Sequence, residues 1–81
     1  MNKEEQKKAI DAFANVRIAE LKNNWAQNYC ARKINQGIVS TASLDQKKKD
    51  VSKKEVEACN LNLKVAEQEI ENFKWILKEN K

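Results

Sequence analysis

The stretch 56–77, VEACNLNLKVAEQEIENFKWIL, decides the fold of this chain. Its apolar side chains recur at alternating spacings of three and four residues, at Val56, Cys59, Leu63, Ala66, Ile70, Phe73 and Leu77. This is the a/d pattern of a coiled coil, and it predicts a helix with one narrow apolar stripe. Because such a stripe has to be covered, the rest of the chain is expected to supply what packs on it.

Residues 3–36 are predicted to form the helix that covers this stripe. Glu4 and Glu5 stand in the opening turn, and Arg32 and Lys33 stand near the end, where each pair complements the helix dipole. The segment has a bulky apolar face, made of Ile10, Phe13, Ala14, Ile18, Leu21, Trp25 and Tyr29. It also has a smaller apolar face, made of Ala9, Ala12, Val16, Ala19, Ala26, Cys30 and Ile34. A helix with two apolar faces needs two neighbours, so we expect a homo-oligomer, most simply a dimer, or a bound protein partner.

The segment 37–52 is predicted to be a basic connector. Gly37, the only glycine, is expected to end the first helix in a left-handed conformation, with Ile38 making the accompanying apolar contact. Two capping boxes follow, at 43–46 (SLDQ) and 52–55 (SKKE), and either could start the last helix. One alternative is a continuous helix from 44 to 79. The other is a short helical turn at 44–50 followed by a main helix over 53–80.

Alignment of the two apolar spans favours the later start. The spans superpose as an antiparallel pair when the numbers of partner residues sum to about 89, which places Cys30 level with Cys59. A chain that folds back at Gly37 would instead give sums of about 80 and leave Phe73 against a polar segment. The expected fold is therefore all-α: one helical domain over residues 1–81, an antiparallel hairpin that oligomerises into a helical bundle.

Composition narrows the class of protein further. The chain has 81 residues, no proline, 35% charged and 41% hydrophobic residues, and a net charge of +4. The apolar positions are too periodic for a disordered chain, and no apolar run approaches the length of a membrane span. The first residues lack the apolar core of a signal peptide, so a cytoplasmic location is expected, with Cys30 and Cys59 as reduced, buried residues.

The residues that most enzymes need are missing. The chain has no histidine, no Cys-x-x-Cys pair and no glycine-rich phosphate loop. Two isolated cysteines fall short of a zinc site, and without histidine there is no ordinary general base near neutral pH. The glutamates of the last helix suit the charged flank of a coiled coil. We therefore expect no enzymatic activity, no metal and no cofactor.

Five lysines lie within eight residues of the connector: Lys47, Lys48, Lys49, Lys53 and Lys54. They could neutralise phosphates or contact an acidic partner, with Arg32 and Lys33 as additions. No aromatic residue interleaves them and no arginine lies among them, whereas arginine and aromatic side chains are what read or stack on bases. A solubilising role is therefore preferred for the run, and nucleic-acid binding is kept as an alternative function.

Trp75 lies off the a/d stripe, at an f position of the heptad. Leu61 and Val65 fall on the same outer side, and Ile76 flanks the stripe. An exposed tryptophan with apolar neighbours marks an interface, so these four residues are the predicted partner-binding positions. The preferred function is a small non-catalytic adaptor or inhibitor that binds a target protein through a helical face. A host-directed factor of a phage or mobile element would suit its size, and a structural assembly subunit is a weaker alternative.

Overall fold

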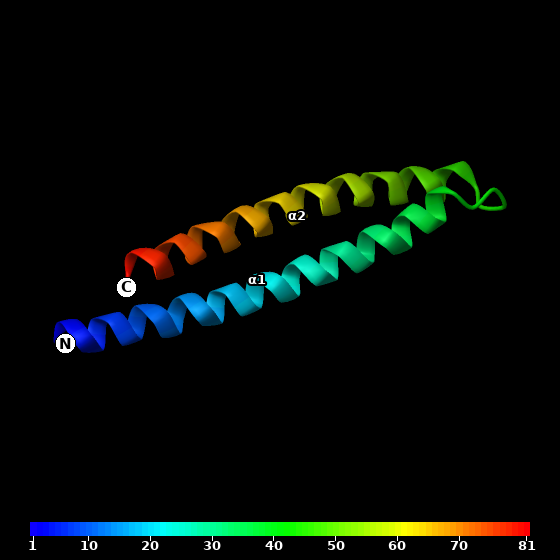
Figure 1. Cartoon of the computed structure of the whole chain (residues 1–81). Coiled ribbons are helices and arrows are strands. Elements are labelled where there is room, and N and C mark those ends of the chain that lie inside the picture. Colours follow the sequence, from blue (N-terminus) through cyan, green and yellow to red (C-terminus); the bar gives the residue numbers. More distant parts are fainter.

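The computed structural model describes residues 1–81 and forms a hairpin of two long helices (Figure 1). Helix α1 spans Lys3–Val39 and helix α2 spans Gln46–Glu79. The helices run antiparallel, so both termini lie at one end of a rod that measures 63 × 14 × 14 Å. The predicted all-α hairpin is confirmed. Neither helix carries an apolar stretch long enough to cross a membrane.

The heptad stripe is the buried face of α2. Cys59, Leu63, Ala66 and Ile70 are buried, and the other members of the stripe, Val56, Phe73 and Leu77, are half-buried. The bulky face of α1 lies opposite, with Ala14, Ile18 and Leu21 buried. Ile18, Leu21 and Ile70 form the central cluster, against which Phe73 and Leu77 pack. The stripe predicted from spacing alone is therefore the interface between the helices.

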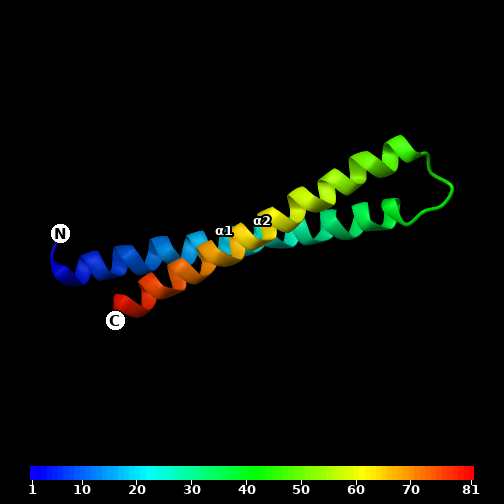
Figure 2. The ribbon, with the colours of Figure 1, turned by 90° about the horizontal axis from the view of Figure 1, so that it is seen from above.

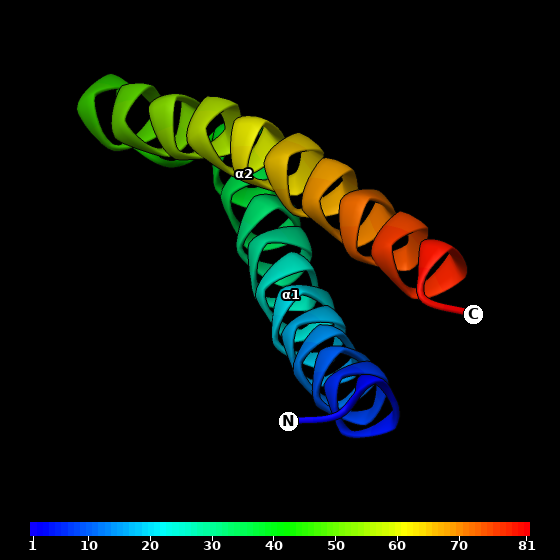
Figure 3. The ribbon, with the colours of Figure 1, turned by 90° about the vertical axis from the view of Figure 1, so that its left-hand side faces the viewer.

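The helices are inclined to each other. Figure 2 shows that the ribbons cross near the middle of the rod, and Figure 3, seen from the end that carries the termini, shows that they point in different directions. Helices that pack through heptad stripes adopt such an inclination, because ridges of side chains on one helix fit grooves on the other.

The predicted register of the hairpin is confirmed by the contacts between the helices. The residue numbers of contacting pairs sum to between 86, for the edge-to-face rings of Phe13 and Phe73, and 92, for Trp25 and Glu67. Asn80 closes the terminal end, because its Nδ2 donates to the Asp11 carboxylate at 2.9 Å and to the Lys7 carbonyl at 3.0 Å. These sums bracket 89 and exclude the register near 80.

The predicted start of the last helix is wrong. Helix α2 begins at Gln46, seven residues before the predicted start at 53. The connector is therefore residues 40–45 and not 37–52. Asp45 is the N-cap, and its Oδ1 accepts the Lys48 N–H at 2.9 Å. Aspartate is among the strongest N-caps, and no glycine or proline interrupts the chain after it. The serine of the later capping box, Ser52, is buried inside the helix and caps nothing.

The predicted end of the first helix at residue 36 is also wrong. Gly37 does not have a positive φ, and α1 continues through it to Val39. Ser40 is the C-cap, and the Gly37 carbonyl accepts hydrogen bonds from the hydroxyls of Ser40 at 3.0 Å and Thr41 at 2.8 Å. A helical glycine costs about 1 kcal/mol. These two hydrogen bonds, together with the partial burial of Ile38 and Val39, offset that cost.

Gly37→Ala is expected to stabilise the protein by about 0.5–1 kcal/mol, because alanine loses less backbone entropy in a helix. The new Cβ would meet no atom within 4 Å. Thermal unfolding followed by circular dichroism measures the change, and for a domain of this size it corresponds to a rise of several degrees in Tm. A fall in Tm would show that residue 37 adopts a left-handed conformation, where alanine is strained.

The half of the interface nearer the connector contains hydrogen-bonded polar side chains as well as the buried Cys59 and the half-buried Val56. Asn62 Nδ2 donates to Asn28 Oδ1 at 3.0 Å, and Arg32 Nη1 donates to Asn60 Oδ1 at 3.0 Å. Arg32 Nε is buried without a partner. The cluster of Ile18, Leu21 and Ile70 therefore lies away from the turn, and hydrogen bonds join the helices both near the turn and, through Asn80, at the terminal end.

Candidate interaction surface

The outer side of α2, away from α1, carries three of the four predicted contact residues. Trp75 and Leu61 are each 62% exposed, and Val65 is exposed between them. Leu61 and Trp75 are 14 residues apart, which is two heptads, so they stand in line about 21 Å apart along the helix. Nothing in the hairpin covers this side, so neither the connector nor the chain terminus packs on Trp75.

Trp75 forms a ridge between two shallow hollows. One, of about 400 Å³, is lined by Glu71, Asn72, Lys74, Trp75 and Lys78. The other, of about 240 Å³, is lined by Ile10, Trp75, Ile76, Glu79 and Asn80. Ile76 thus belongs to the second hollow, at the junction of the two helices, and not to the line of Leu61 and Val65. The ridge and the hollow beside Ile10 and Ile76 give a partner side chain an apolar surface, whereas charged and amide side chains line most of the other hollow.

Two amides interrupt the line of apolar residues. Gln68 Nε2 donates to Asn72 Oδ1 at 2.9 Å, and both residues lie on the outer side between Val65 and Trp75. The surface consequently consists of two apolar patches. Leu61 and Val65 form one, Trp75 with its hollows forms the other, and the two amides separate them. A partner would have to match this order of apolar, polar and apolar contacts.

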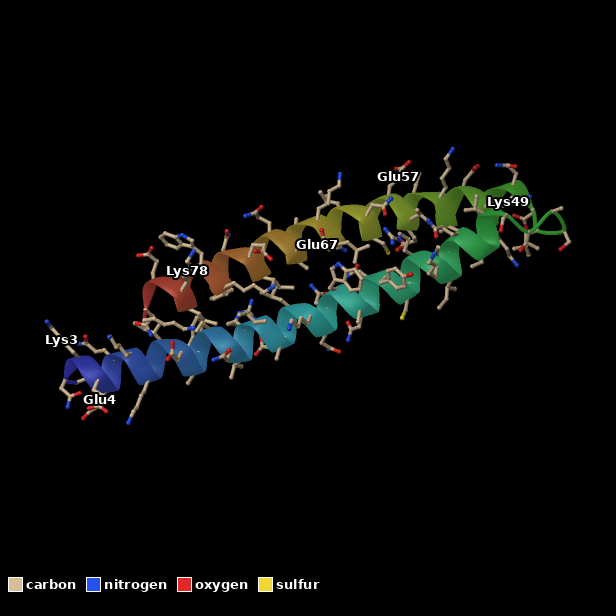
Figure 4. All side chains as sticks on the ribbon, in the orientation of Figure 1. Lys3, Glu4, Lys49, Glu57, Glu67 and Lys78 are labelled. Carbon is tan, nitrogen blue, oxygen red and sulfur yellow. The ribbon has the colours of Figure 1, made fainter.

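The lysine run does not form one face. Lys47, Lys48 and Lys49 occupy the first turn of α2, where successive side chains point about 100° apart. Lys47 and Lys54, seven residues apart, share the outer side of the helix, whereas Lys49 is half-buried. Figure 4 shows Lys49 at the turn end of the rod. The positive charge therefore surrounds the start of α2 and is not concentrated on one groove.

The cysteines do not lie together as a buried pair. Cys59 is buried in the interface, but Cys30 is exposed, and both are free. The expectation that both are buried is wrong for Cys30, because that residue belongs to the smaller apolar face of α1, which points away from α2. The correct register brings the two residues level along the rod but leaves Cys30 on the outside.

A cluster around Trp25 was not predicted as a site. Trp25 Nε1–H donates to Glu67 Oε1 at 2.9 Å, and the Trp25 and Tyr29 rings stack with centroids 5.2 Å apart. The Arg32 guanidinium lies 5.2 Å from the Tyr29 centroid. In Figure 4, Glu67 lies beside α1, whereas Glu57 projects from the far side of α2. The stack was predicted only as part of the apolar face of α1, and the hydrogen bond explains why a glutamate is placed beside it.

The signal for this cluster and for the polar half of the interface was present in the sequence. Asn28 follows Leu21 by seven residues, and Arg32 follows Trp25 by seven. Residues one heptad apart occupy equivalent positions, so the spacing predicts that both polar side chains face α2. Asn28 and Arg32 are left out when the side of α1 that faces α2 is defined by apolar residues alone.

The remaining charges lie at the surface. Lys74 Nζ lies 3.5 Å from Glu71 Oε1. Lys8 pairs with Glu4 at 3.7 Å, and Arg17 pairs with Glu20. Exposed pairs of this kind contribute little to stability. No three His, Cys, Asp or Glu side chains gather into a group suited to a metal ion.

Comparison of the chain with protein-family models, with curated proteins and with solved structures finds no match.

Proposed function

We propose that this protein is a non-catalytic adaptor or inhibitor that binds a target protein through the outer side of α2. The observation that carries the proposal is the exposure of Trp75 in line with Leu61, on a helix whose opposite side is already buried. Tryptophan is the residue most enriched among interface positions that dominate binding energy, and leaving one in water stabilises nothing in the isolated chain.

The shape of the surface suggests how the target is built. A rigid helix that presents apolar residues along one side fits a hydrophobic groove on the partner. Leu61, Val65 and Trp75 would enter such a groove, while Lys74 and Lys78 would remain at its rim. We place this activity in the cytoplasm, a reducing compartment in which the free thiols of Cys30 and Cys59 would persist.

Trp75→Ala is expected to reduce target binding at least tenfold, because truncation of a central interface tryptophan typically costs about 2 kcal/mol or more. Helicity and Tm should change little, since the side chain contributes to no buried cluster. Capture of the target from a lysate of the source organism by tagged wild-type and variant proteins measures the effect. Glu57→Ala, an exposed change off the apolar line, is the matched control and should bind normally.

The same capture separates the proposal from its alternatives. At roughly 0.5 M salt the Debye length falls to about 4–5 Å, so contacts that rest on exposed charge fail. A single protein retained through salt and nuclease treatment and lost with Trp75→Ala would support the adaptor. Material lost on nuclease treatment, or on replacement of Lys47, Lys48 and Lys49, would overturn it in favour of nucleic acid. Loss of helicity in Trp75→Ala would show that Trp75 is structural.

A further inference from the structure

The side of α1 that faces away from α2 carries a second, complete heptad stripe. Its members alternate at spacings of three and four residues, and all are exposed: Ala9, Ala12, Val16, Ala19, Asn23, Ala26 and Cys30. The stripe is about 32 Å long. It lies roughly opposite the stripe of Ala14, Ile18 and Leu21 that packs on α2, so the hairpin uses one side of α1 and leaves the other without a neighbour.

Large apolar side chains lie in this stripe and beside it. Phe13, Val16 and Ile34 are 61%, 57% and 66% exposed. Phe13 and Ile34 occupy e positions beside the stripe, and Tyr29 occupies a g position on its other border. The face is therefore an apolar surface with small residues along its centre, and the small residues allow another helix to approach closely.

The hairpin exposes more surface than a compact chain of its mass. Its accessible surface is 6237 Å² at 9.4 kDa, whereas the scaling law for folded monomers gives about 5,000 Å². The excess, about 1,200 Å², exceeds the roughly 800 Å² that each partner contributes to a standard stable interface. One dimer contact would therefore bring the surface per chain into the ordinary range.

We propose that a second copy of this chain packs on the outer side of α1, parallel and in register. In this arrangement each stripe residue meets its own copy, so the Asn23 amide hydrogen-bonds the partner's Asn23. A single asparagine at an a position is a device that sets the register of a parallel pair. In an antiparallel pair with Ala12 level with the partner's Cys30, Asn23 would face only the methyl group of the partner's Ala19.

The charges along the borders point to the same arrangement. In a parallel pair, a g residue meets the e residue five positions later on the partner. Lys22 then meets the partner's Gln27, Asn15 meets the partner's Glu20, and Tyr29 covers the partner's Ile34. In the antiparallel pair with Ala12 level with the partner's Cys30, Lys22 would face the partner's Lys22 and Glu20 would face the partner's Glu20. Like charges at these positions are destabilising, so the parallel pair is favoured.

Cys30 reports on this geometry directly. It is exposed in the single chain and, at an a position, it would lie against the partner's Cys30 in the parallel dimer. A bismaleimide with a short spacer joins two such thiols by adding one to each ring, and no oxidant is needed. The test uses Cys59→Ala protein, in which Cys30 is the only thiol, and Cys30→Ala protein as the negative control.

The parallel dimer predicts efficient cross-linking of Cys30 to its copy at low micromolar protein. Moving the thiol to the other end of the stripe, as Ala12→Cys in the absence of Cys30 and Cys59, should cross-link equally well. If neither protein cross-links alone but a mixture of the two does, the chains are antiparallel and the proposal is overturned. A mass corresponding to one chain at all concentrations in sedimentation equilibrium would also overturn it.

Ala19→Glu tests the surface independently of the thiols. It places two carboxylates against each other in the dimer and should raise the dimer dissociation constant at least about tenfold. At a protein concentration where the chain is monomeric, the helicity of the variant should equal that of the wild type, because Ala19 is exposed in the hairpin. Ala58→Glu, an equivalent change on the outer side of α2, is the control and should dimerise normally. This inference does not rest on target binding by Trp75, which lies on the other helix, so either can fail alone.

Discussion

Leu63→Ala should lower the free energy of unfolding by about 2–5 kcal/mol, the range measured for truncation of a buried leucine. Leu63 is 4% exposed and lies in the middle of the stripe through which α2 packs on α1. A rod of two helices has few buried side chains to share the loss, and small scaffolds are seldom more stable than about 3–5 kcal/mol. Most of the variant should therefore be unfolded at room temperature.

Leu61→Ala is the matched control for this prediction. It removes the same atoms from the same helix two residues earlier, but from a side chain in contact with water, and should change stability by less than about 0.5 kcal/mol. Urea titration followed by circular dichroism at 222 nm, at one protein concentration, compares the two variants. Equal losses, or a larger loss for Leu61, would mean that the stripe of α2 is not its buried side.

Ala66→Leu should destabilise the hairpin by about 1–3 kcal/mol, because it adds methylene groups to a site with no room for them. Ala66 is among the most buried residues and sits where the helices approach closely, between Leu63 and Ile70. Alanine and leucine have similar helix propensities, so the loss would come from separation of the helices and not from weaker helix formation.

The control for overpacking is Ala58→Leu, on the exposed outer side of α2. The added side chain meets only water there, and the free energy of unfolding should stay within about 0.5 kcal/mol. The same urea titration gives both values. An unchanged or higher stability for Ala66→Leu would show that the helices accommodate a larger side chain at this level, and would contradict the prediction.

The parts of the fold that could be predicted are those that depend on many residues at once. The a/d spacing over 56–77 involves seven side chains, so it gave the buried side of α2. Alignment of two apolar spans gave the register within about three residues. Each of these signals sums over a whole helix, and no single exception overturns it.

The ends of the helices could not be predicted because each depends on one or two residues with nearly balanced energies. Asp45 and Ser52 are both competent N-caps, and a choice between them involves about 1 kcal/mol. Gly37 carries a helical cost of similar size, which the hydroxyls of Ser40 and Thr41 offset. Rules that score one residue at a time are less accurate than these differences of about 1 kcal/mol, so they do not decide where a helix begins or ends.

The exposed surface was predicted in part. Exposure of Trp75, Leu61 and Val65 followed from their positions off the stripe. The hydrogen bond between Trp25 and Glu67 did not, because it joins residues 42 positions apart through a glutamate that spacing alone treats as a charged flank. Polar contacts of this kind depend on side-chain geometry, which the order of apolar residues does not describe.

The uneven distribution of apolar contacts along the rod bears on the order in which the hairpin forms. The buried cluster joins Ile18 to Ile70, which are 52 residues apart, and lies far from the six-residue turn. Closing the longer loop costs about 2 kcal/mol more in chain entropy than closing the turn. Formation of the turn brings together Cys59 and the hydrogen-bonded side chains near it, whereas the cluster of Ile18, Leu21 and Ile70 still has to form. The turn on its own is therefore not expected to hold the two helices together, and the contacts around Ile18 and Ile70 complete the hairpin.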